Sequence, residues 1–115
     1  MLALVVTFAV GAATPAMALS AKQKAVIKII KTAAKSKKLS NAEISALLKI
    51  CRRESTYRPT AINGTCKGLF QLKTHFARSK WANARWNTLK AINYIKHRYK
   101  TCRRALSHSY RFGWY

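Results

Sequence analysis

The segment from Ser40 to Glu54 carries apolar side chains at helical spacing, and this pattern ends on a carboxylate. Positions i, i+3, i+4 and i+7 of one face are Ile44, Leu47, Leu48 and Cys51. Three residues further, the same face reaches Glu54. A carboxylate there costs free energy to desolvate, and a helix C-terminus disfavours negative charge. We therefore interpret Glu54 as a candidate functional residue; the alternative is a structural ion pair with a neighbouring arginine.

The scarcity of acids makes Glu54 more unusual. The 115-residue chain has 23 Lys and Arg but only 2 Asp and Glu, which gives a formal net charge of +21. The other acid, Glu43, has an ordinary interpretation. Ser40 to Glu43 has the pattern of a capping box, in which Ser40 begins a helix and Glu43 reaches back to its backbone.

The first 18 residues have the pattern of a secretory signal. They are apolar from Leu2 to Ala13 and end in Ala16-Met17-Ala18, a small-residue cleavage pattern. No positive charge lies near Met1, so a retained anchor and a buried helix are the alternatives, although the apolar run is short for a membrane span. We expect cleavage after Ala18, a basic amphipathic helix in residues 19–39 and the main unit in residues 40–115.

All 23 basic residues follow Ala18, so the exported part would carry the whole excess charge. Such a field predicts a polyanionic partner or surface. For an exported protein the candidates are anionic cell-wall polymers and membrane surfaces, and the apparent export disfavours nucleic acid. We expect a monomer that needs no cofactor.

The remaining pattern predicts a mainly α-helical, small single domain. Helical spacing over Ala21–Lys38 favours a first helix packed on the core, with binding to a membrane surface as the alternative. Further along we expect a loop, a short extended segment, a short broken helix, a helix capped by Asn87 and a last helix stopped by Gly113. Their ranges are 57–67, 68–72, 74–86, 88–99 and 102–110.

Several of these residues resemble a known family. Glu54-Ser55 and Gly68-Leu69-Phe70-Gln71 resemble the Glu-Ser and Gly-Leu-x-Gln signatures of lysozyme-like lytic transglycosylases, in the family's order and spacing. The segments around Asn93-Tyr94 and Gly113-Trp114-Tyr115 resemble small secreted transglycosylase-like domains of actinobacteria and their phages. The resemblance covers about residues 46–115. It implies a lysozyme-like fold, secretion to a cell wall and cleavage between N-acetylmuramic acid and N-acetylglucosamine in peptidoglycan.

The number of acidic residues limits the mechanisms by which this chain could cleave a glycosidic bond. A glycosidase of the usual kind needs two carboxyl groups about 5 to 9.5 Å apart. Glu43 and Glu54 are 11 residues apart on one expected helix, or roughly 16 Å, and the chain has no Asp. A single carboxylate suffices if Glu54 protonates the glycosidic oxygen and then takes a proton from the C6 hydroxyl of the sugar. A hydrolase that positions a water with neutral groups, and a non-enzymatic cationic antimicrobial protein, are the alternatives.

The resemblance also implies roles for other residues. Ser55 would orient the catalytic carboxylate or a substrate acetamido group, the amide of Gln71 would bind substrate, and Tyr94 would steady Glu54; Asn63 is a weaker candidate. Aromatic candidates for stacking on sugars are Tyr57, Trp81, Trp86, Tyr110 and Trp114. The arginines beside Glu54 should lower its pKa, so burial must outweigh them for it to work as an acid. For His108 we favour a structural role over that of a general base.

The three cysteines, Cys51, Cys66 and Cys102, allow three alternative single disulfides. The resemblance implies Cys51 with Cys102, with Cys66 unpaired, although Cys51 precedes Glu54 by three residues where close relatives place it immediately before the acid. The cysteines and the scattered histidines have no metal-ligand spacing, so we expect no zinc site.

Overall fold

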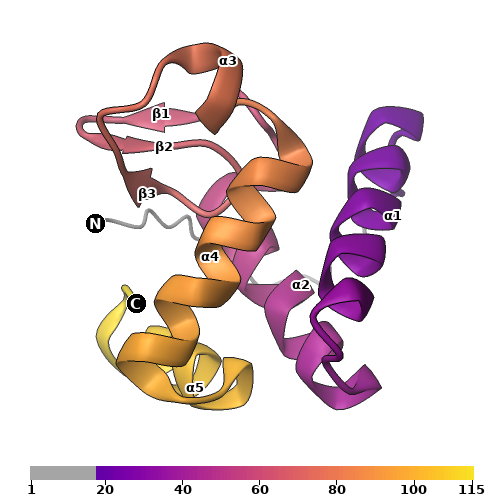
Figure 1. The fold of residues 1–115 in the computed structure, drawn as a ribbon, viewed down its shortest axis with the longest axis vertical. Helices are drawn as coiled ribbons and strands as arrows, with labels where there is room; N and C mark the ends of the chain where they lie inside the picture. The colour runs from indigo at the N-terminus through magenta and orange to yellow at the C-terminus, as the bar shows by residue number, and fades with distance from the viewer. Residues whose placement is uncertain (1–17) are drawn as a thin grey trace, which may run out of the picture.

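The computed structural model describes residues 18–115, and the segment expected to be a secretory signal lies outside them except for Ala18. This part of the chain forms five helices and a small antiparallel sheet (Figure 1). The helices are α1 (Ala21–Ser36), α2 (Asn41–Ser55), α3 (Arg78–Trp81), α4 (Ala84–Tyr99) and α5 (Cys102–Phe112). The strands are β1 (Ile62–Asn63), β2 (Cys66–Lys67) and β3 (Leu72–Lys73). The expected mainly α-helical single domain is confirmed.

Helix α1 packs on the core, as its spacing favoured. Ser20 caps it, in a capping box with Gln23. Its inner face is buried against α2 and α4 and consists of Val26, Ile30, Ala33 and Ala34. The lysines of α1 lie on the exposed side. The apolar face that a membrane-binding helix would insert is therefore used inside the protein.

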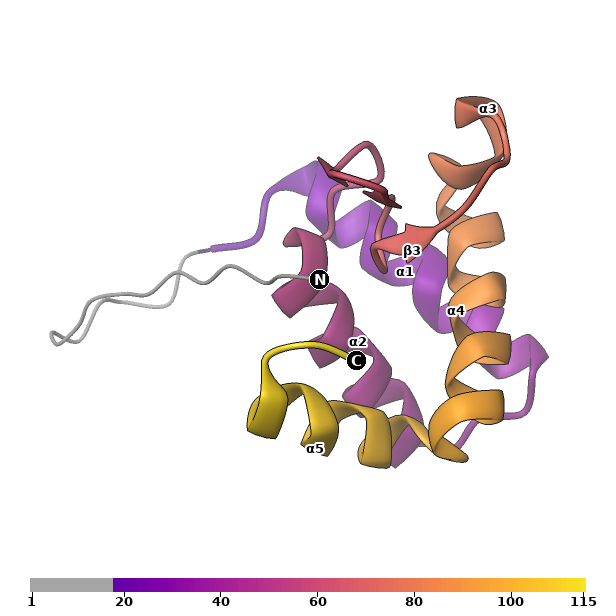
Figure 2. The ribbon, with the colours of Figure 1, turned by 90° about the vertical axis from the view of Figure 1, so that its left-hand side faces the viewer.

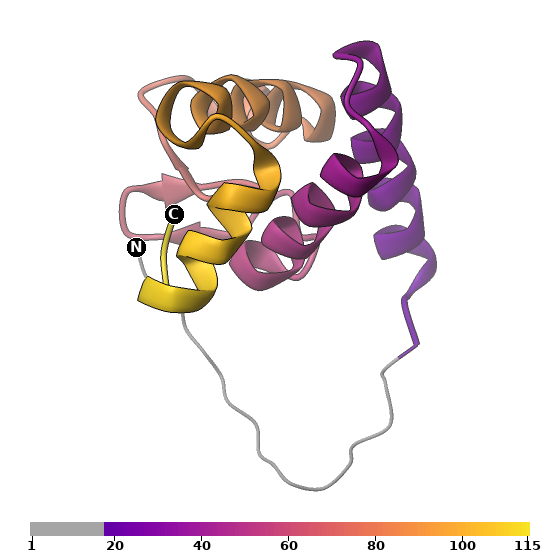
Figure 3. The same cartoon turned by 90° about the horizontal axis from the view of Figure 1, so that it is seen from below.

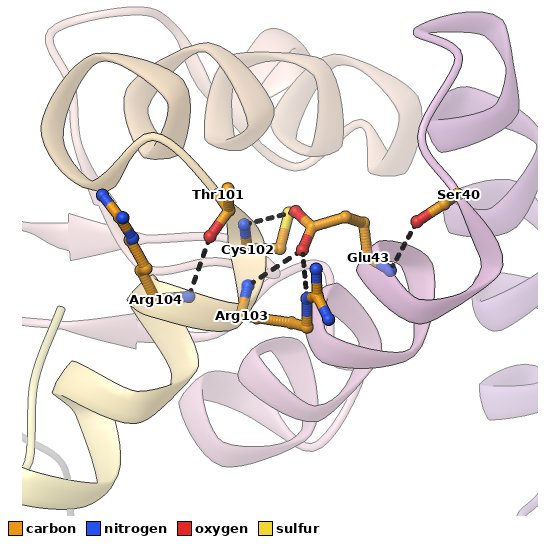
Figure 4. A network of polar contacts seen from close by, with 6 residues as sticks. All are labelled: Ser40, Glu43, Thr101, Cys102, Arg103 and Arg104. Atoms are coloured by element: carbon orange, nitrogen blue, oxygen red, sulfur yellow. Dashed lines mark hydrogen bonds and ion pairs between the residues drawn. The ribbon is translucent and has the colours of Figure 1, made fainter.

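Helix α2 begins after the Ser40 cap, as predicted, but the role predicted for Glu43 is wrong. Ser40 accepts a hydrogen bond from the Glu43 backbone N–H, yet the Glu43 carboxylate does not return to Ser40. The carboxylate accepts hydrogen bonds from the backbone N–H groups of Cys102 and Arg103 at the start of α5 (Figure 4). It also forms an ion pair with the Arg103 guanidinium, with Nε and Oε2 3.1 Å apart. The free N–H groups of a helix start are better partners for a carboxylate than Ser40, because they carry partial positive charge.

The same contacts set the ionisation of Glu43. Partial burial acts to raise the pKa of this carboxyl, but the hydrogen bonds from Cys102 and Arg103 outweigh burial and hold the pKa below its usual value. Glu43 therefore stays charged and joins α2 to α5, which lies beside it (Figure 3).

The strands form one antiparallel sheet in the order β1-β2-β3. The segment expected to be extended is a tight connection between β2 and β3, in which Gly68 has a φ of +84° and Gln71 a φ of +52°. A buried side chain, Asn87, fixes this connection to α4. Its Oδ1 accepts the Phe70 N–H at 2.9 Å, and its Nδ2 donates to the carbonyl oxygens of Lys67 and Trp81.

This position of Asn87 corrects the helix cap predicted there. Helix α4 begins one turn earlier, after Asn83, whose side chain accepts the Trp86 N–H at 2.8 Å. Two asparagines four residues apart both fit a cap, and Asn83 takes that role because Asn87 is needed inside. The short helix with a break that we expected over residues 74–86 is present in part: α3 is followed by a break at residues 82–83, and residues 84–86 already belong to α4.

The C-terminal segment returns to the core. Gly113, with a φ of +82°, ends α5 as expected, and the chain then turns back over the end of α5 (Figure 2). The Tyr115 hydroxyl donates to the Phe70 carbonyl at 2.7 Å. No helix within residues 18–115 is long and apolar enough to cross a membrane.

The expected disulfide between Cys51 and Cys102 is not formed, and all three cysteines are free, buried thiols. Cys102 lies at the first residue of α5, beside Glu43 in the first turn of α2, whereas Cys51 is about two turns further along α2. Burial is the main cause that raises the pKa of each of these two thiols to about 12. Both therefore stay protonated near neutral pH.

Candidate active site

A cavity of about 540 Å³ opens where α2, α4, the sheet and the C-terminal segment meet. Glu54 reaches it from the last turn of α2. The other residues that line it are Cys66, Gln71, Leu72, Lys73, Thr74, Phe76, Trp86, Lys90, Tyr94, Arg98, Trp114 and Tyr115. Glu54 is the one acidic side chain among them, and a cavity of this size can hold part of an extended ligand.

Burial dominates the electrostatics of Glu54. It raises the pKa of this carboxyl from 4.5 to about 7, while Arg53 acts in the opposite direction with a smaller effect. A substantial share of Glu54 is therefore protonated at neutral pH. The condition set by the sequence, that burial must outweigh the neighbouring arginines, is met in this structure.

The arginines beside Glu54 are held elsewhere. Arg53 donates to the side chain and the carbonyl oxygen of Ser109 and lies 4.7 Å from the centroid of the Tyr110 ring. Arg58 donates to the Ser55 carbonyl at 2.9 Å. Within residues 18–115 the single ion pair joins Arg103 to Glu43, so the alternative of an ion-paired Glu54 has no support there.

Gln71 lies in the wall of the cavity, and its side-chain amide is largely occupied. Its Nε2 donates to the carbonyl oxygens of Ala61 and Gly68, at 3.1 and 2.9 Å, and its Oε1 accepts from Asn63 Nδ2 at 2.9 Å. These bonds hold Gln71 in a left-handed conformation that non-glycine residues rarely adopt. Since both N–H groups are used, Oε1 has the remaining capacity for a ligand, as a second acceptor site.

Ser55 is buried behind the site and does not line the cavity. Its hydroxyl donates to the Cys51 carbonyl at 3.3 Å and accepts the Arg58 N–H at 3.2 Å. These bonds fix the last turn of α2, the turn that carries Glu54. Ser55 is thus placed to support the position of Glu54 through the backbone, without a hydrogen bond to its carboxylate among the described contacts.

Tyr94 and Tyr115 stand together at the cavity, and sequence reasoning missed Tyr115. Their rings meet edge to face with centroids 5.6 Å apart. Burial is the largest cause that raises the pKa of both phenols, and the charge of Glu54 raises each further. Because the charge of Glu54 changes the pKa of both phenols, Tyr94 and Tyr115 are near enough to Glu54 to interact with it electrostatically. The terminal Gly-Trp-Tyr motif was the available signal for Tyr115.

The aromatic candidates divide between the cavity and other places. Trp86 and Trp114 line the cavity, whereas Tyr57 and Trp81 are buried in the protein interior and Tyr110 covers Arg53. Phe76, which sequence reasoning did not select, meets Trp86 edge to face at 5.2 Å.

His108 does not line the cavity itself but contacts Trp114, which does. Its Nδ1 is 2.9 Å from the Trp114 carbonyl oxygen and 3.4 Å from the Tyr99 hydroxyl. These contacts support the structural role that we favoured, because His108 holds the segment that carries Trp114.

Comparisons with known proteins add no family to this geometry. No family model, no curated protein and no solved structure matches the chain. No group of three or more metal-ligating side chains occurs within residues 18–115. The features of this protein that bear on its function are therefore the cavity and its single acidic side chain.

Proposed function

We propose that this protein is a secreted lytic transglycosylase that cleaves peptidoglycan glycan strands, with Glu54 as its catalytic acid and base. One observation carries the proposal: the cavity has a single acidic side chain, Glu54, whose carboxyl is largely buried and has a pKa of about 7. The other acid of the chain, Glu43, is occupied at the start of α5. A glycosidase mechanism that needs two carboxylates would therefore find no second acidic side chain to act with Glu54.

The reaction balances with one carboxyl group. Protonated Glu54 gives its proton to the glycosidic oxygen between N-acetylmuramic acid and N-acetylglucosamine, and the bond from C1 to that oxygen breaks. The C6 hydroxyl oxygen of the same muramic acid then attacks C1, and its proton passes to the Glu54 carboxylate. The products are a 1,6-anhydro sugar and a new chain end, and Glu54 regains its first state. A pKa near the working pH suits both proton transfers.

The surroundings of Glu54 fit this scheme. Tyr94 and Tyr115 line the same cavity as Glu54, and burial of the Glu54 carboxyl keeps its proton in place. Gln71 presents Oε1 as an acceptor for a substrate N–H or hydroxyl, and Asn63 orients it. Trp86 and Trp114 offer faces for sugar rings. The net charge of +21 would concentrate the protein on an anionic cell wall.

The same charge favours a second candidate, a cationic wall-binding antimicrobial protein without enzymatic activity. The buried apolar face of α1 removes the amphipathic helix that such a protein would insert into a membrane. A non-enzymatic protein of this kind would then bind the cell wall or the membrane surface by its positive charge alone. A hydrolase that uses Glu54 and a water differs from the proposal only in its product.

A matched pair of variants tests the proposal. Glu54→Gln and Glu43→Gln each replace one carboxyl group by an amide of similar size, but only the first changes the cavity. Purified peptidoglycan is incubated with each protein, and the released sugars are identified by mass. We expect anhydro-sugars from the wild type and from Glu43→Gln, and a loss of at least about 100-fold in Glu54→Gln, because general acid–base catalysis contributes about 10²- to 10⁴-fold.

The products separate the candidates. Hydrated reducing ends that disappear in Glu54→Gln would identify a hydrolase. Absence of released sugar, together with bacterial killing unchanged by Glu54→Gln, would identify the cationic binder and overturn the proposal.

A further inference from the structure

Helix α4 gives the cavity a wall in which aromatic and cationic side chains alternate. Trp86, Lys90, Tyr94 and Arg98 are four residues apart, so they form one row along the helix, and all four line the cavity. We call them the α4 row. Lys90 and Arg98 are eight residues apart, which corresponds to about 12 Å along the helix. The row is therefore long enough to run beside more than one sugar of a strand.

The two cations of the α4 row rest on aromatic rings. Lys90 Nζ lies 5.4 Å from the centroid of Trp86 and 5.7 Å from that of Phe76. Arg98 Cζ lies 5.4 Å from the centroid of Trp114. In the part of the chain that the structure describes, neither Lys90 nor Arg98 forms an ion pair with an acid. The one ion pair within residues 18–115 joins Arg103 to Glu43, in the first turn of α2. A ligand in the cavity thus meets two positive charges that the protein does not neutralise.

We propose that the α4 row selects glycan strands that carry free carboxylates at intervals, over uncharged glycans of the same length. This inference rests on the proposed function for the nature of the strand. Sugar faces can stack on Trp86 and Tyr94, while carboxylates can pair with Lys90 and Arg98. An uncharged strand would displace water from both cations without giving them a partner.

The preference places the protein in a reaction sequence. In peptidoglycan the lactyl carboxylate of muramic acid is free only when no peptide is attached to it. The reaction that supplies such a strand is amide hydrolysis, which removes the peptide and leaves the carboxylate. The protein would therefore act after an amidase of this kind.

Single-stranded nucleic acid is the rival ligand, because it also combines stacking rings with regular negative charge. The Glu54 carboxyl lies in the same cavity, and its charged form would repel phosphates and carboxylates alike, so charge does not separate the two ligands. The same carboxyl can donate a proton to a glycosidic oxygen. The arrangement consequently favours the acidic glycan.

Binding is measured by calorimetry in the Glu54→Gln background, so that no strand is cut. The probes are peptide-free glycan strands with free carboxylates, the same strands capped as methylamides, and oligothymidylate of similar length. Lys90→Met and Arg98→Met remove the two cations. Lys96→Met is the matched control, since Lys96 is exposed on α4 and does not line the cavity.

We expect Lys90→Met and Arg98→Met each to weaken binding of the free-acid strand about 3-fold, and about 10-fold together, as exposed ion pairs do. We expect Lys96→Met to leave it unchanged and capping to weaken it. Equal weakening by Lys96→Met, equal binding of capped strands, or tighter binding of oligothymidylate would overturn the inference. The capping comparison needs no substitution in the row, so it holds even where a variant fails to fold.

The two proposals can fail separately. If the wild type produces anhydro-sugars but capping has no effect on binding, the selectivity is wrong and the proposed function stands. If free-acid strands bind as expected but the wild type never cuts them, the enzymatic function is wrong and the binding site stands.

Discussion

Gly68 packs so closely against Asn87 that a β-carbon at position 68 would overlap the side-chain amide of Asn87. The same β-carbon would lie 2.6 Å from the carbonyl oxygen of Trp81. This close approach lets the buried amide of Asn87 reach three backbone groups at once. It fixes the turn that presents Gln71 to the cavity.

Gly68→Ala should therefore destabilise the protein more than Gly64→Ala does. Both glycines have positive φ, but nothing lies within 4 Å of a β-carbon at Gly64. We expect a cost of about 1–2 kcal/mol for Gly64→Ala from backbone strain alone. For Gly68→Ala we expect about 3 kcal/mol or more, because steric overlap is added. Urea unfolding of both variants measures the difference, and equal losses would contradict the close packing.

The rate of cleavage should fall as the pH rises through about 7. The acid step needs a protonated Glu54, and burial raises the pKa of this carboxyl to about 7. We expect kcat/KM on peptidoglycan to lose about tenfold per pH unit well above that value. A rate that already falls near pH 4.5, the ordinary value, would show that Glu54 is exposed to water.

Glu54→Gln should stabilise the protein at pH 8 and leave its stability unchanged at pH 4. Folding raises the pKa of Glu54 from 4.5 to about 7, so between these values the folded state binds more protons than the unfolded state. The stability of the wild type therefore falls as the pH rises through this window, by up to about 3 kcal/mol. Thermal unfolding at both pH values checks this, and a destabilised variant at pH 8 would contradict it.

Glu43→Ala should cost about 2 kcal/mol, because it leaves the first N–H groups of α5 without their acceptor. Arg103→Ala should cost less than about 0.5 kcal/mol, since the Arg103 side chain is 69% exposed and its ion pair is screened by water. Chemical denaturation of both variants compares the helix cap with the ion pair. Similar losses would mean that the ion pair, rather than the cap, stabilises the joint.

All three cysteines should react with iodoacetamide after denaturation without a reducing agent, giving three added labels by mass. In the folded protein, labelling of Cys51 and Cys102 should be slow, because burial raises the pKa of both thiols to about 12 and blocks access. A denatured protein that takes up one label would instead contain a disulfide, and peptide mapping would identify the pair.

Helical periodicity predicted much of the fold. The spacing of apolar residues located α1 and α2 to within about two residues, and it placed Glu54 at the end of a buried face; Gly113 indicated the end of α5. These features are local, so a single stretch of sequence contains them. The start of α4 was wrong because Asn83 and Asn87 offer the same capping chemistry, and only packing decides between them.

Contacts between residues distant in sequence, and several of the side chains that face the cavity, were not predicted. Glu43 binds the start of α5, 59 residues away, and no local pattern indicates that partner. Lys90 and Arg98 are two of 23 basic residues and were not selected from the sequence, although they and the aromatic residues Trp86 and Tyr94 follow one another at intervals of four residues. In so basic a chain, charge alone does not show which cations face a cavity.

The cavity also joins the early and late parts of the chain: Glu54 comes from its middle, whereas Trp114 and Tyr115 are added about 60 residues later. During synthesis, a polypeptide that has passed Glu54 but not yet reached Tyr115 holds the acid without the wall that buries it. Its carboxyl would sit in water and titrate as an ordinary glutamate. Under the proposed function, such a polypeptide would lack the raised pKa that the acid step needs until its last residues are in place.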